Sequence, residues 1–496
     1  MLKTYKTFIV FLLIGALSLN LIGCGSSTPS NTNTAQKESW QKVLTQDETE
    51  EYCYQAPDRI QEEWNDDTGK LKVIIDAEVK IPEESGYPIA SLTQQPIDSV
   101  FLETLQNAVV PSESILYKAD DTKWSENMYV PTMSQSDIQA WINYLQTILL
   151  DDNSILNKAK DTNTEQYESS KVILEDTLKQ YQTILDEIPP GFCETSVQNL
   201  SLYNANDIST FLFDAGKTTK AMINISHDIT GFYHISFNNK GFLDYSGSMY
   251  LPNTLGGQVN NTQSNLENSN ITYMDAYNQA IKLTESLGVN QRLKLCNSWS
   301  GYANIAGLDL KSCYYFSFDN AQKGLINKDM FWAQKRIDQQ NSSPIVTETL
   351  IVCVDDDGIV SFDWINPCSI NTIKENVQLM DFSQLMDQEK SSINIVANVL
   401  GTYKQNDLGN EEVVESDTLE IHTIDLCLNA LSYDGQIYLI PAWNFNGKWT
   451  RKYTQKNYSV EPEITNEESE LVYEGPLCCL FSINAIDGTI ISYKNE

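Results

Sequence analysis

The sequence predicts an α+β fold in which antiparallel sheets pack against a few helices. Three observations lead to this prediction. Apolar and polar residues alternate from Leu71 to Ile81, apolar stripes at helical spacing occur between residues 138 and 185, and segments that read strand, glycine turn, strand recur after Gly191. Helices and strands therefore occupy different stretches of the chain, as α+β folds require.

The N-terminus predicts a signal peptide over residues 1–23. Lys3 and Lys6 precede a 15-residue apolar run, Phe8 to Ile22, which is shorter than the roughly 20 apolar residues of a membrane-spanning helix. The run ends at Gly23-Cys24, which resembles the lipobox of bacterial lipoproteins. This resemblance implies that Cys24 is lipidated and becomes the new N-terminus. The alternative is an ordinary secretory signal that happens to end beside a cysteine.

Residues 24–39 predict a flexible tether. From Gly25 the chain reads GSSTPSNTNTAQKES, a run of small and polar residues with no apolar side chain large enough to pack. Fifteen such residues span roughly 20 Å root-mean-square. We therefore expect a folded body held near the extracytoplasmic face of the cell membrane through the lipid on Cys24.

The remaining 473 residues carry 31 Lys and Arg against 67 Asp and Glu. This length is enough for two or three domains with real cores. The acidic surface repels a phosphate backbone, and no basic stretch provides an exception, so nucleic acid is excluded as a partner.

Residues 40–195 predict an N-terminal α+β domain. The alternating segment that begins at Leu71 predicts a half-buried strand that ends at Pro82. A helical hairpin is expected to follow, and Pro189-Pro190-Gly191 is expected to end it. Its two apolar stripes are Ile138, Trp141, Ile142, Leu145, Ile148 and Leu149, then Tyr167, Leu174, Leu178, Tyr181 and Leu185.

Three hairpins are predicted downstream, at residues 232–249, 351–367 and 480–493, because each segment has a polar turn that ends in glycine. Helices are expected after Thr272, closing at Gly288, and after Asp381 or Ser383, closing at Gly401. A helix followed by a hairpin thus occurs at 272–367 and again at 383–493. This pattern predicts a duplicated module, with a central part at 196–370 and a C-terminal part at 371–496. Chance similarity of two Asp-Gly hairpins is the alternative.

The chain from Leu71 to Glu496 resembles a family of uncharacterised clostridial-type lipoproteins, defined only as a domain of unknown function. The segments that carry the resemblance are LKVIIDAEVKIP, SGYPIASLTQQP, the helical hairpin from Ser134 to Pro190, VDDDGIVSFDWINP, YLIPAWNF and INAIDGTI. The last two also resemble PepSY-type and YycH-type modules of Gram-positive envelopes. The resemblance implies an extracytoplasmic binding or regulatory role, with no catalytic residues to carry over.

Catalytic motifs do not contradict this interpretation. The three histidines, His227, His234 and His422, form no His-Glu-x-x-His motif, and no nucleophile elbow, phosphate-binding loop or dinucleotide fingerprint occurs. Ser39 and Lys42 match Ser-x-x-Lys, but they lie at the edge of the tether. A pair of carboxylates for glycoside hydrolysis stays open, because it needs only two acids at the right separation.

Asp355, Asp356 and Asp357 form a candidate acidic cluster in a hairpin turn. Hard cations such as calcium bind several carboxylates. The spacing does not fit an EF-hand, because the register that places Asp355, Asp357 and Gly358 in the loop puts Cys353 and Trp364 at ligand positions. We therefore favour a solvated turn, and we predict no metal and no cofactor.

Cysteines and aromatic residues leave two further questions. Lipidation of Cys24 leaves nine cysteines, which cannot all pair within one chain, and Cys296 with Cys313 is the disulfide to test first. Trp299, Trp443 and Trp449 could line a groove for a sugar or peptide, although placement in the core is favoured.

The sequence thus predicts a non-catalytic lipoprotein that binds an envelope protein through sheet edges or its acidic surface. The alternatives are a solute-binding lipoprotein that takes a glycan or peptide, and a carboxylate-dependent hydrolase.

Overall fold

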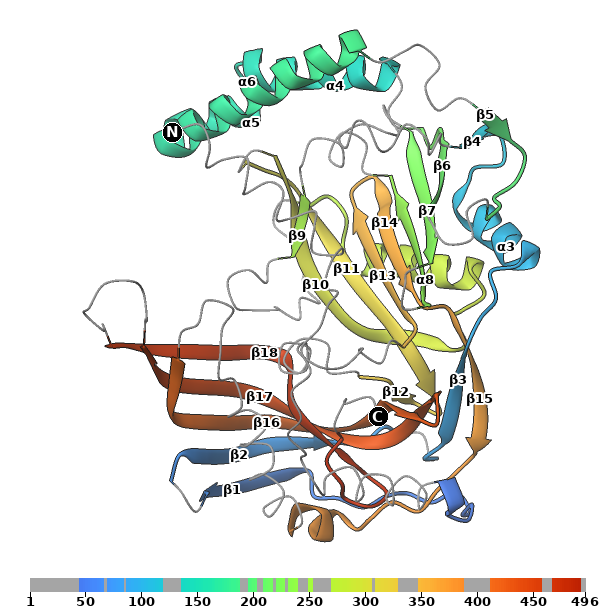
Figure 1. The fold of residues 1–496 in the computed structure, drawn as a ribbon, viewed down its shortest axis with the longest axis vertical. Helices are drawn as coiled ribbons and strands as arrows, with labels where there is room; N and C mark the ends of the chain where they lie inside the picture. Colours follow the sequence, from blue (N-terminus) through green and yellow to red (C-terminus); the bar gives the residue numbers. More distant parts are fainter. Residues whose placement is uncertain are drawn as a thin grey trace, which may run out of the picture. The chain divides into compact units, whose positions relative to one another are not determined.

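The computed structural model describes residues 44–66, 69–83, 86–118, 135–187, 195–202, 208–216, 220–227, 231–239, 249–252, 269–305, 308–328, 347–387, 411–456 and 466–491. Cys24, the tether, and Ser39 with Lys42 lie outside these ranges. The described chain contains two sheets and several helices (Figure 1), so the α+β prediction is confirmed.

The first sheet has seven strands in the order β1-β2-β16-β17-β3-β15, and β18 pairs with β17 beside β3. All its pairings are antiparallel except that of β2 with β16, which is parallel. Its strands are β1 (Arg59–Asn65), β2 (Leu71–Lys80), β3 (Ile89–Gln94), β15 (Cys368–Lys374), β16 (Glu411–Tyr433), β17 (Gln436–Lys456) and β18 (Asn466–Asn484). Strands from the two ends of the chain therefore form one sheet.

The second sheet has eleven strands in the order β5-β4-β6-β7-β8-β14-β13-β11-β10-β9, with β12 beside β11. They are β4 (Leu116–Lys118), β5 (Thr195–Val197), β6 (Ser209–Phe213), β7 (Ala221–His227), β8 (Tyr233–Asn238), β9 (Met249–Pro252), β10 (Leu293–Ile305), β11 (Leu308–Gln322), β12 (Leu325–Ile326), β13 (Thr349–Asp355) and β14 (Gly358–Ile365).

The main described core lies between one face of the second sheet and two helices, α3 (Ser99–Val109) and α8 (Tyr273–Ser286). Phe101 and Leu105 of α3 and Ala276 and Ala280 of α8 are buried there against sheet residues such as Phe316. Alternate residues of each strand point to this face, which is why the strands carry aromatic residues at spacing two.

The helices α4 (Gln135–Leu150), α5 (Ile155–Thr162) and α6 (Thr164–Glu187) have an apolar core of their own. Trp141 and Leu145 of α4 are fully buried against residues of α6 that include Leu174 and Tyr181. The predicted helical hairpin is confirmed, with α5 as an additional short helix that Ser154 caps by accepting a hydrogen bond from the Asn157 amide at 3.2 Å. The predicted stop at Pro189 lies outside the described residues.

The local sequence patterns predicted individual strands and helices correctly, as β2 and α8 show. Strand β2 runs from Leu71 to Lys80 with Leu71, Val73, Ile75 and Ala77 buried, as the alternation predicted. Helix α8 begins after Thr272, whose hydroxyl accepts a hydrogen bond from the Asp275 amide at 3.1 Å, and Gly288 takes a φ of 69° just after the helix.

The predicted hairpins had three different outcomes. Strands β13 and β14 form the hairpin at 351–367, and Gly358 adopts a φ of 107° in its turn. The pairing predicted for the hairpin at 232–249 is wrong, because both edges of β8 are taken by β7 and β14. Residues 240–248, which include most of the predicted turn and return strand, lie outside the described residues. In the hairpin predicted at 480–493, the pairing among the described residues is one isolated antiparallel bridge between Ile483 and Ile490.

The helix expected after Asp381 is described only over 382–387, where Asp381 accepts hydrogen bonds from the Ser383 and Gln384 amides at 2.9 and 3.4 Å. The rest of that helix, up to Gly401, lies outside the described residues.

Residues 45–54, which we call the entry segment, lie along residues 375–380. The Thr49 amide donates to the Asn376 carbonyl at 3.1 Å, and the Asn376 side-chain amide donates to the Glu50 carbonyl at 2.6 Å. Tyr52 accepts from the Leu379 amide at 2.7 Å, and Tyr54 donates to the Met380 carbonyl at 2.5 Å. The division into modules at 40–195, 196–370 and 371–496 stays a prediction.

Candidate functional site

The acidic turn at 355–357 is part of the structural framework. The Asp356 carboxylate accepts hydrogen bonds from the Ser269 hydroxyl and the Asn270 amide, both at 3.0 Å, and from the Asn270 side chain at 2.9 Å. Asp355 is buried and accepts from the Asp357 amide at 2.7 Å. These carboxylates accept hydrogen bonds from nearby residues of the same chain, and Asp356 thereby holds the loop that leads into α8.

The described residues contain no group of three His, Cys, Asp or Glu side chains arranged as metal ligands are. His227 contacts the Gly231 carbonyl at 3.0 Å through its ring nitrogen Nε2. His234 lies 3.0 Å from Asp363 on an adjacent strand, with about half of each side chain exposed. His422 is also exposed.

Seven cysteines are described, and all are free thiols: Cys53, Cys296, Cys313, Cys353, Cys368, Cys427 and Cys479. Cys296 and Cys313, the pair that the sequence offered as the first disulfide to test, are therefore not bonded to each other. In the register of β10 and β11, Cys313 lies opposite Gly301, five residues from Cys296 along the same strand. Burial raises the pKa values of Cys296 and Cys427 well above the ordinary thiol value, so both are held in the protonated, unreactive form.

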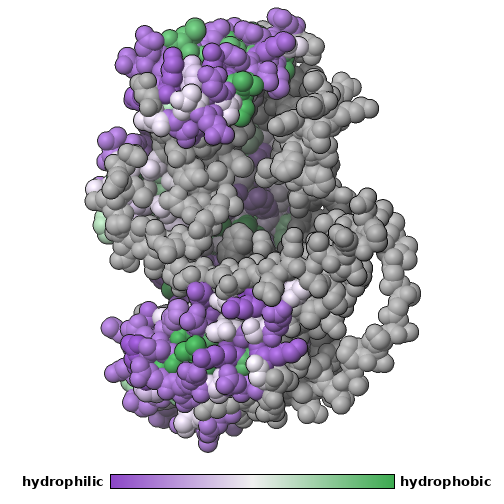
Figure 2. All heavy atoms as spheres, turned by 90° about the vertical axis from the view of Figure 1, so that its left-hand side faces the viewer, coloured by the Kyte–Doolittle hydropathy of each residue, from purple (hydrophilic) through white to green (hydrophobic). Residues whose placement is uncertain are grey.

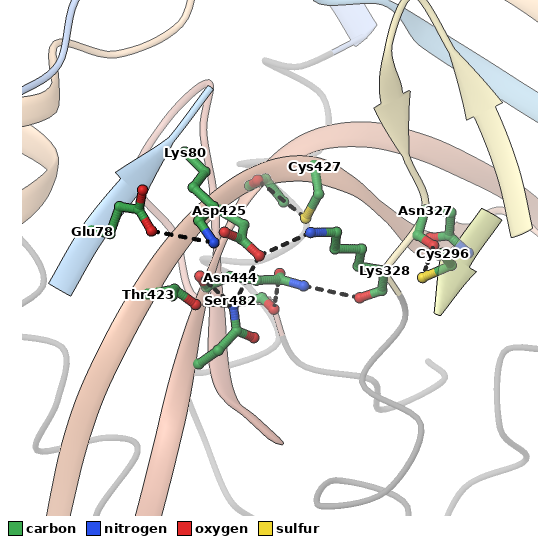
Figure 3. A network of polar contacts seen from close by, with 12 residues as sticks. Glu78, Lys80, Cys296, Asn327, Lys328, Thr423, Asp425, Cys427, Asn444 and Ser482 are labelled. Carbon is green, nitrogen blue, oxygen red and sulfur yellow. Dashed lines mark hydrogen bonds and ion pairs between the residues drawn. The ribbon is translucent and has the colours of Figure 1, made fainter. Parts of the chain in front are cut away.

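A buried polar network lies where the residues after β12 contact β16, β17 and β18 (Figure 3). Lys328 Nζ lies 2.8 Å from Asp425 Oδ2, and the Asn444 side chain donates to the Lys328 carbonyl at 2.9 Å. Ser482 in turn donates to the Asn444 side-chain oxygen at 2.6 Å. A parallel bridge between Asn327 and Leu428 adjoins these contacts, so the network joins the second sheet to the first.

The charge on Lys328 is stable in this setting. Burial is the largest single effect and lowers its pKa, but the neighbouring groups, Asp425 first among them, together raise the pKa by more, and the net result lies above the ordinary lysine value. The Asn446 side chain also donates to Asp425 Oδ2 at 3.2 Å. A lysine with a raised pKa is a poor nucleophile and a poor general base at neutral pH, so the network is suited to structure rather than catalysis.

A second buried cluster surrounds Glu348, whose side chain is fully buried. Arg292 donates to both carboxylate oxygens, through Nε at 2.9 Å and Nη2 at 2.8 Å. Asn320 and the Trp364 indole each donate to Glu348 at 3.0 Å. Four donors thus satisfy this carboxylate, and they hold the guanidinium plane of Arg292 in one orientation.

An open cleft of about 320 Å³ adjoins this cluster, between α3, the end of α8, β14 and β15. Its apolar lining includes Phe101 and Trp364, whose rings stack with centroids 5.0 Å apart, together with Leu287. Arg292 and Asp98 also line it, so one cationic and one anionic side chain border the same cavity. Polar and apolar groups contribute about equally to its accessible lining, and fixed polar groups of this kind give a small-molecule site its specificity.

The tryptophans singled out in the sequence are part of the packing. Trp443 is fully buried and lies against Phe382, with ring centroids 4.9 Å apart. Trp449 is buried beside Arg451, and its indole donates to Asp417 at 2.9 Å. Trp299 stacks on Tyr315 at 5.4 Å, and both side chains are half-buried.

Sequence reasoning did not identify Arg292, Glu348 or Asp98. A usable signal was present, because the chain has only four arginines, Arg59, Arg292, Arg336 and Arg451. Two of them make bidentate pairs with buried carboxylates, Arg292 with Glu348 and Arg451 with Asp417. Arg suits such pairs because its planar fork matches a carboxylate.

Comparisons with known proteins give one match. No family model matches the chain, and a search of the curated proteins finds no match. The chain is similar to an uncharacterized protein from Eubacterium rectale, known from its crystal structure, with 13% sequence identity and a TM-score of 0.38. The match covers 91% of this chain and 98% of that protein, but a TM-score at this level supports no argument about function.

Proposed function

We propose that this chain is a membrane-anchored extracytoplasmic lipoprotein that binds a protein of the cell envelope and performs no catalysis. The observation that carries the proposal is the position of Cys24, directly after the apolar run and before the polar tether. The resemblance to clostridial-type lipoproteins and to PepSY-type and YycH-type modules is part of the same proposal.

The chemistry of the described residues supports binding over catalysis. Three buried carboxylates are paired with cations: Asp425 with Lys328, Glu348 with Arg292, and Asp417 with Arg451. Buried thiols such as Cys427 have raised pKa values, which suppress their nucleophilic form. No described helix has the length and hydropathy to cross a bilayer.

The strand β1 offers a surface for a protein partner. Within the described ranges β1 pairs only with β2, and Arg59, Gln61, Glu63 and Asn65 on it are exposed. An outer strand can add a strand from a partner through main-chain hydrogen bonds. The described surface on the face drawn in Figure 2 is largely hydrophilic, which is compatible with a polar, charge-guided interface.

The anchor is tested by metabolic labelling with palmitate and by fractionation. We expect the wild type in the membrane fraction with label attached, and Cys24→Ala to be unlabelled and released from the membrane. Equal labelling of the two proteins would contradict lipidation at Cys24.

The partner is tested with a photo-crosslinking amino acid placed in the lipidated protein on native membranes. Incorporation at Gln61, exposed on β1, should give an adduct with a single envelope protein that weakens as salt is raised. Incorporation at Glu103, exposed on α3, is the matched control. Adducts equal in pattern at both positions would count against β1 as the interface.

Solute binding is a second candidate function, and the cleft beside α3 is the observation that favours it. Among the charged residues that line the cleft, Asp98 is the one carboxylate, whereas glycoside hydrolysis uses two. The cleft therefore supports the binding of a small molecule better than its hydrolysis.

A further inference from the structure

The cleft beside α3 has features that define the class of its ligand. This inference rests on the second proposed function, solute binding, and does not depend on the protein partner.

Arg292 provides a fixed donor. Its Nε and Nη2 bind Glu348, and Nη2 also donates to the Gln95 side chain at 3.2 Å. Among the residues that the structure describes, no acceptor is hydrogen-bonded to Nη1, and the Arg292 side chain is 22% exposed. Because Glu348 holds the guanidinium in place, a ligand carboxylate can bind at Nη1 with little loss of side-chain freedom.

Asp98 provides the opposite charge. One oxygen of its carboxylate accepts a hydrogen bond from the Phe101 amide at 2.9 Å and caps α3. Its other oxygen accepts no hydrogen bond from the described residues, and the side chain is exposed. A carboxylate in this state is suited to bind an ammonium group.

The cleft also limits the size and polarity of its ligand. A volume of about 320 Å³ lies at the lower end of the range for small-molecule sites. Val100, which is 68% exposed, provides accessible apolar surface, whereas Phe101, Trp364 and Leu287 also border the cleft but are buried. The local charge is close to balanced, because Glu348 already neutralises Arg292 and the N-terminus of α3 partly offsets Asp98.

We infer that this cleft binds a small zwitterion with an apolar side chain, such as a free amino acid or a dipeptide. The ligand carboxylate binds Arg292, its ammonium group binds Asp98, and its side chain packs against the exposed Val100 and the bordering edge of Phe101.

The test is isothermal titration calorimetry on the full mature protein with four probes: leucyl-leucine, its C-terminal amide, its N-acetyl derivative and a neutral disaccharide. We expect leucyl-leucine to bind, and each blocked derivative to bind about tenfold more weakly, because one charge-assisted hydrogen bond is lost. The disaccharide should not bind.

Two variants assign the contacts. Asp98→Asn keeps a good helix cap and removes the charge, so it should weaken leucyl-leucine about tenfold and leave the N-acetyl derivative unchanged. Glu103→Gln, on the same helix but outside the lining, is the control and should bind as the wild type does. Arg292→Lys keeps a cation beside Glu348 and should weaken leucyl-leucine but not its C-terminal amide.

The possible outcomes distinguish failure of the zwitterion site from failure of solute binding itself. Binding of the disaccharide without leucyl-leucine would overturn the zwitterion and leave solute binding standing. Binding of leucyl-leucine that Asp98→Asn and Arg292→Lys leave unchanged would overturn this site. Absence of binding by all four probes would overturn the inference, and a broader ligand screen by thermal shift would then decide the fate of solute binding.

Discussion

Lys328 Nζ lies 2.8 Å from Asp425 Oδ2, although the two residues are 97 positions apart in the chain. Lys328 follows β12 of the second sheet, and Asp425 lies on β16 of the first. The lysine side chain is 29% exposed and the aspartate side chain 10% exposed, so the pair lies between a surface pair and a fully buried one. Because both side chains are charged, their contribution to the stability of the junction between the sheets depends on pH and can be measured.

The first prediction concerns pH. The Lys328 pKa is raised in the folded protein, so the pair stabilises the fold fully below the unfolded lysine pKa of about 10.4 and loses this effect as pH rises through the higher folded value. Lys328→Met should lower the free energy of unfolding by about 2 kcal/mol at pH 8. The gap between wild type and variant, from urea denaturation, should narrow at alkaline pH. Lys282→Met, at an exposed position of α8, is the control and should show no such gap.

The second prediction concerns a different buried pair. Arg451 donates to both carboxylate oxygens of Asp417, at 2.8 and 3.0 Å, and both residues are buried. Asp417→Asn leaves the arginine charge without a counter-ion and should cost about 3 kcal/mol of unfolding free energy, measured by urea denaturation. Asp76→Asn removes the counter-ion of Arg59 in an exposed pair and should have a far smaller effect. Equal losses in the two variants would show that burial does not set the strength of these pairs.

The third prediction concerns thiol reactivity. Cys53 is exposed, whereas burial raises the pKa of Cys368 to about 12 and the pKa values of Cys296 and Cys427 well above normal. A short pulse of maleimide on the native protein should modify Cys53 and spare the other three, as read by peptide mass spectrometry. The same pulse in urea should modify all four. Rapid native labelling of Cys427 would refute the described burial.

The fourth prediction concerns the acidic turn. Asp356→Ala removes three hydrogen bonds to Ser269 and Asn270, so amide exchange should accelerate over residues 269–275 and stability should fall by about 1 kcal/mol. Glu285→Ala removes an exposed carboxylate from α8 and should leave this exchange unchanged. Millimolar calcium should not alter either result. Calcium-dependent protection that Asp356→Ala abolishes would instead establish the turn as a cation site.

Sequence reasoning succeeded where the signal was local. The alternation at β2, the cap at Thr272 and the glycine turn at Gly358 each depend on residues close together in the chain. It failed at the hairpin expected over 232–249, because strand β8 has two adjacent strands elsewhere, β7 and β14, and a local turn signal does not report that competition.

The residues of the candidate site could not be predicted from the sequence for the same reason. Arg292 and Glu348 are 56 residues apart, and Asp98 is far from both in the chain. Nothing in their local sequence marks them as neighbours, and the parallel pairing of β2 with β16 is equally long-range. The register of a fold is set by the burial of whole faces, which single segments do not encode.

The entry segment has a mechanical consequence if Cys24 holds the protein to the membrane as proposed. Tension on the tether would then act on the entry segment before it reached β1. The hydrogen bonds of residues 46–54 with residues 375–380 would resist this tension first. At the lowest forces the entry segment would therefore detach from residues 375–380, which would lengthen the tether while both sheets stay intact.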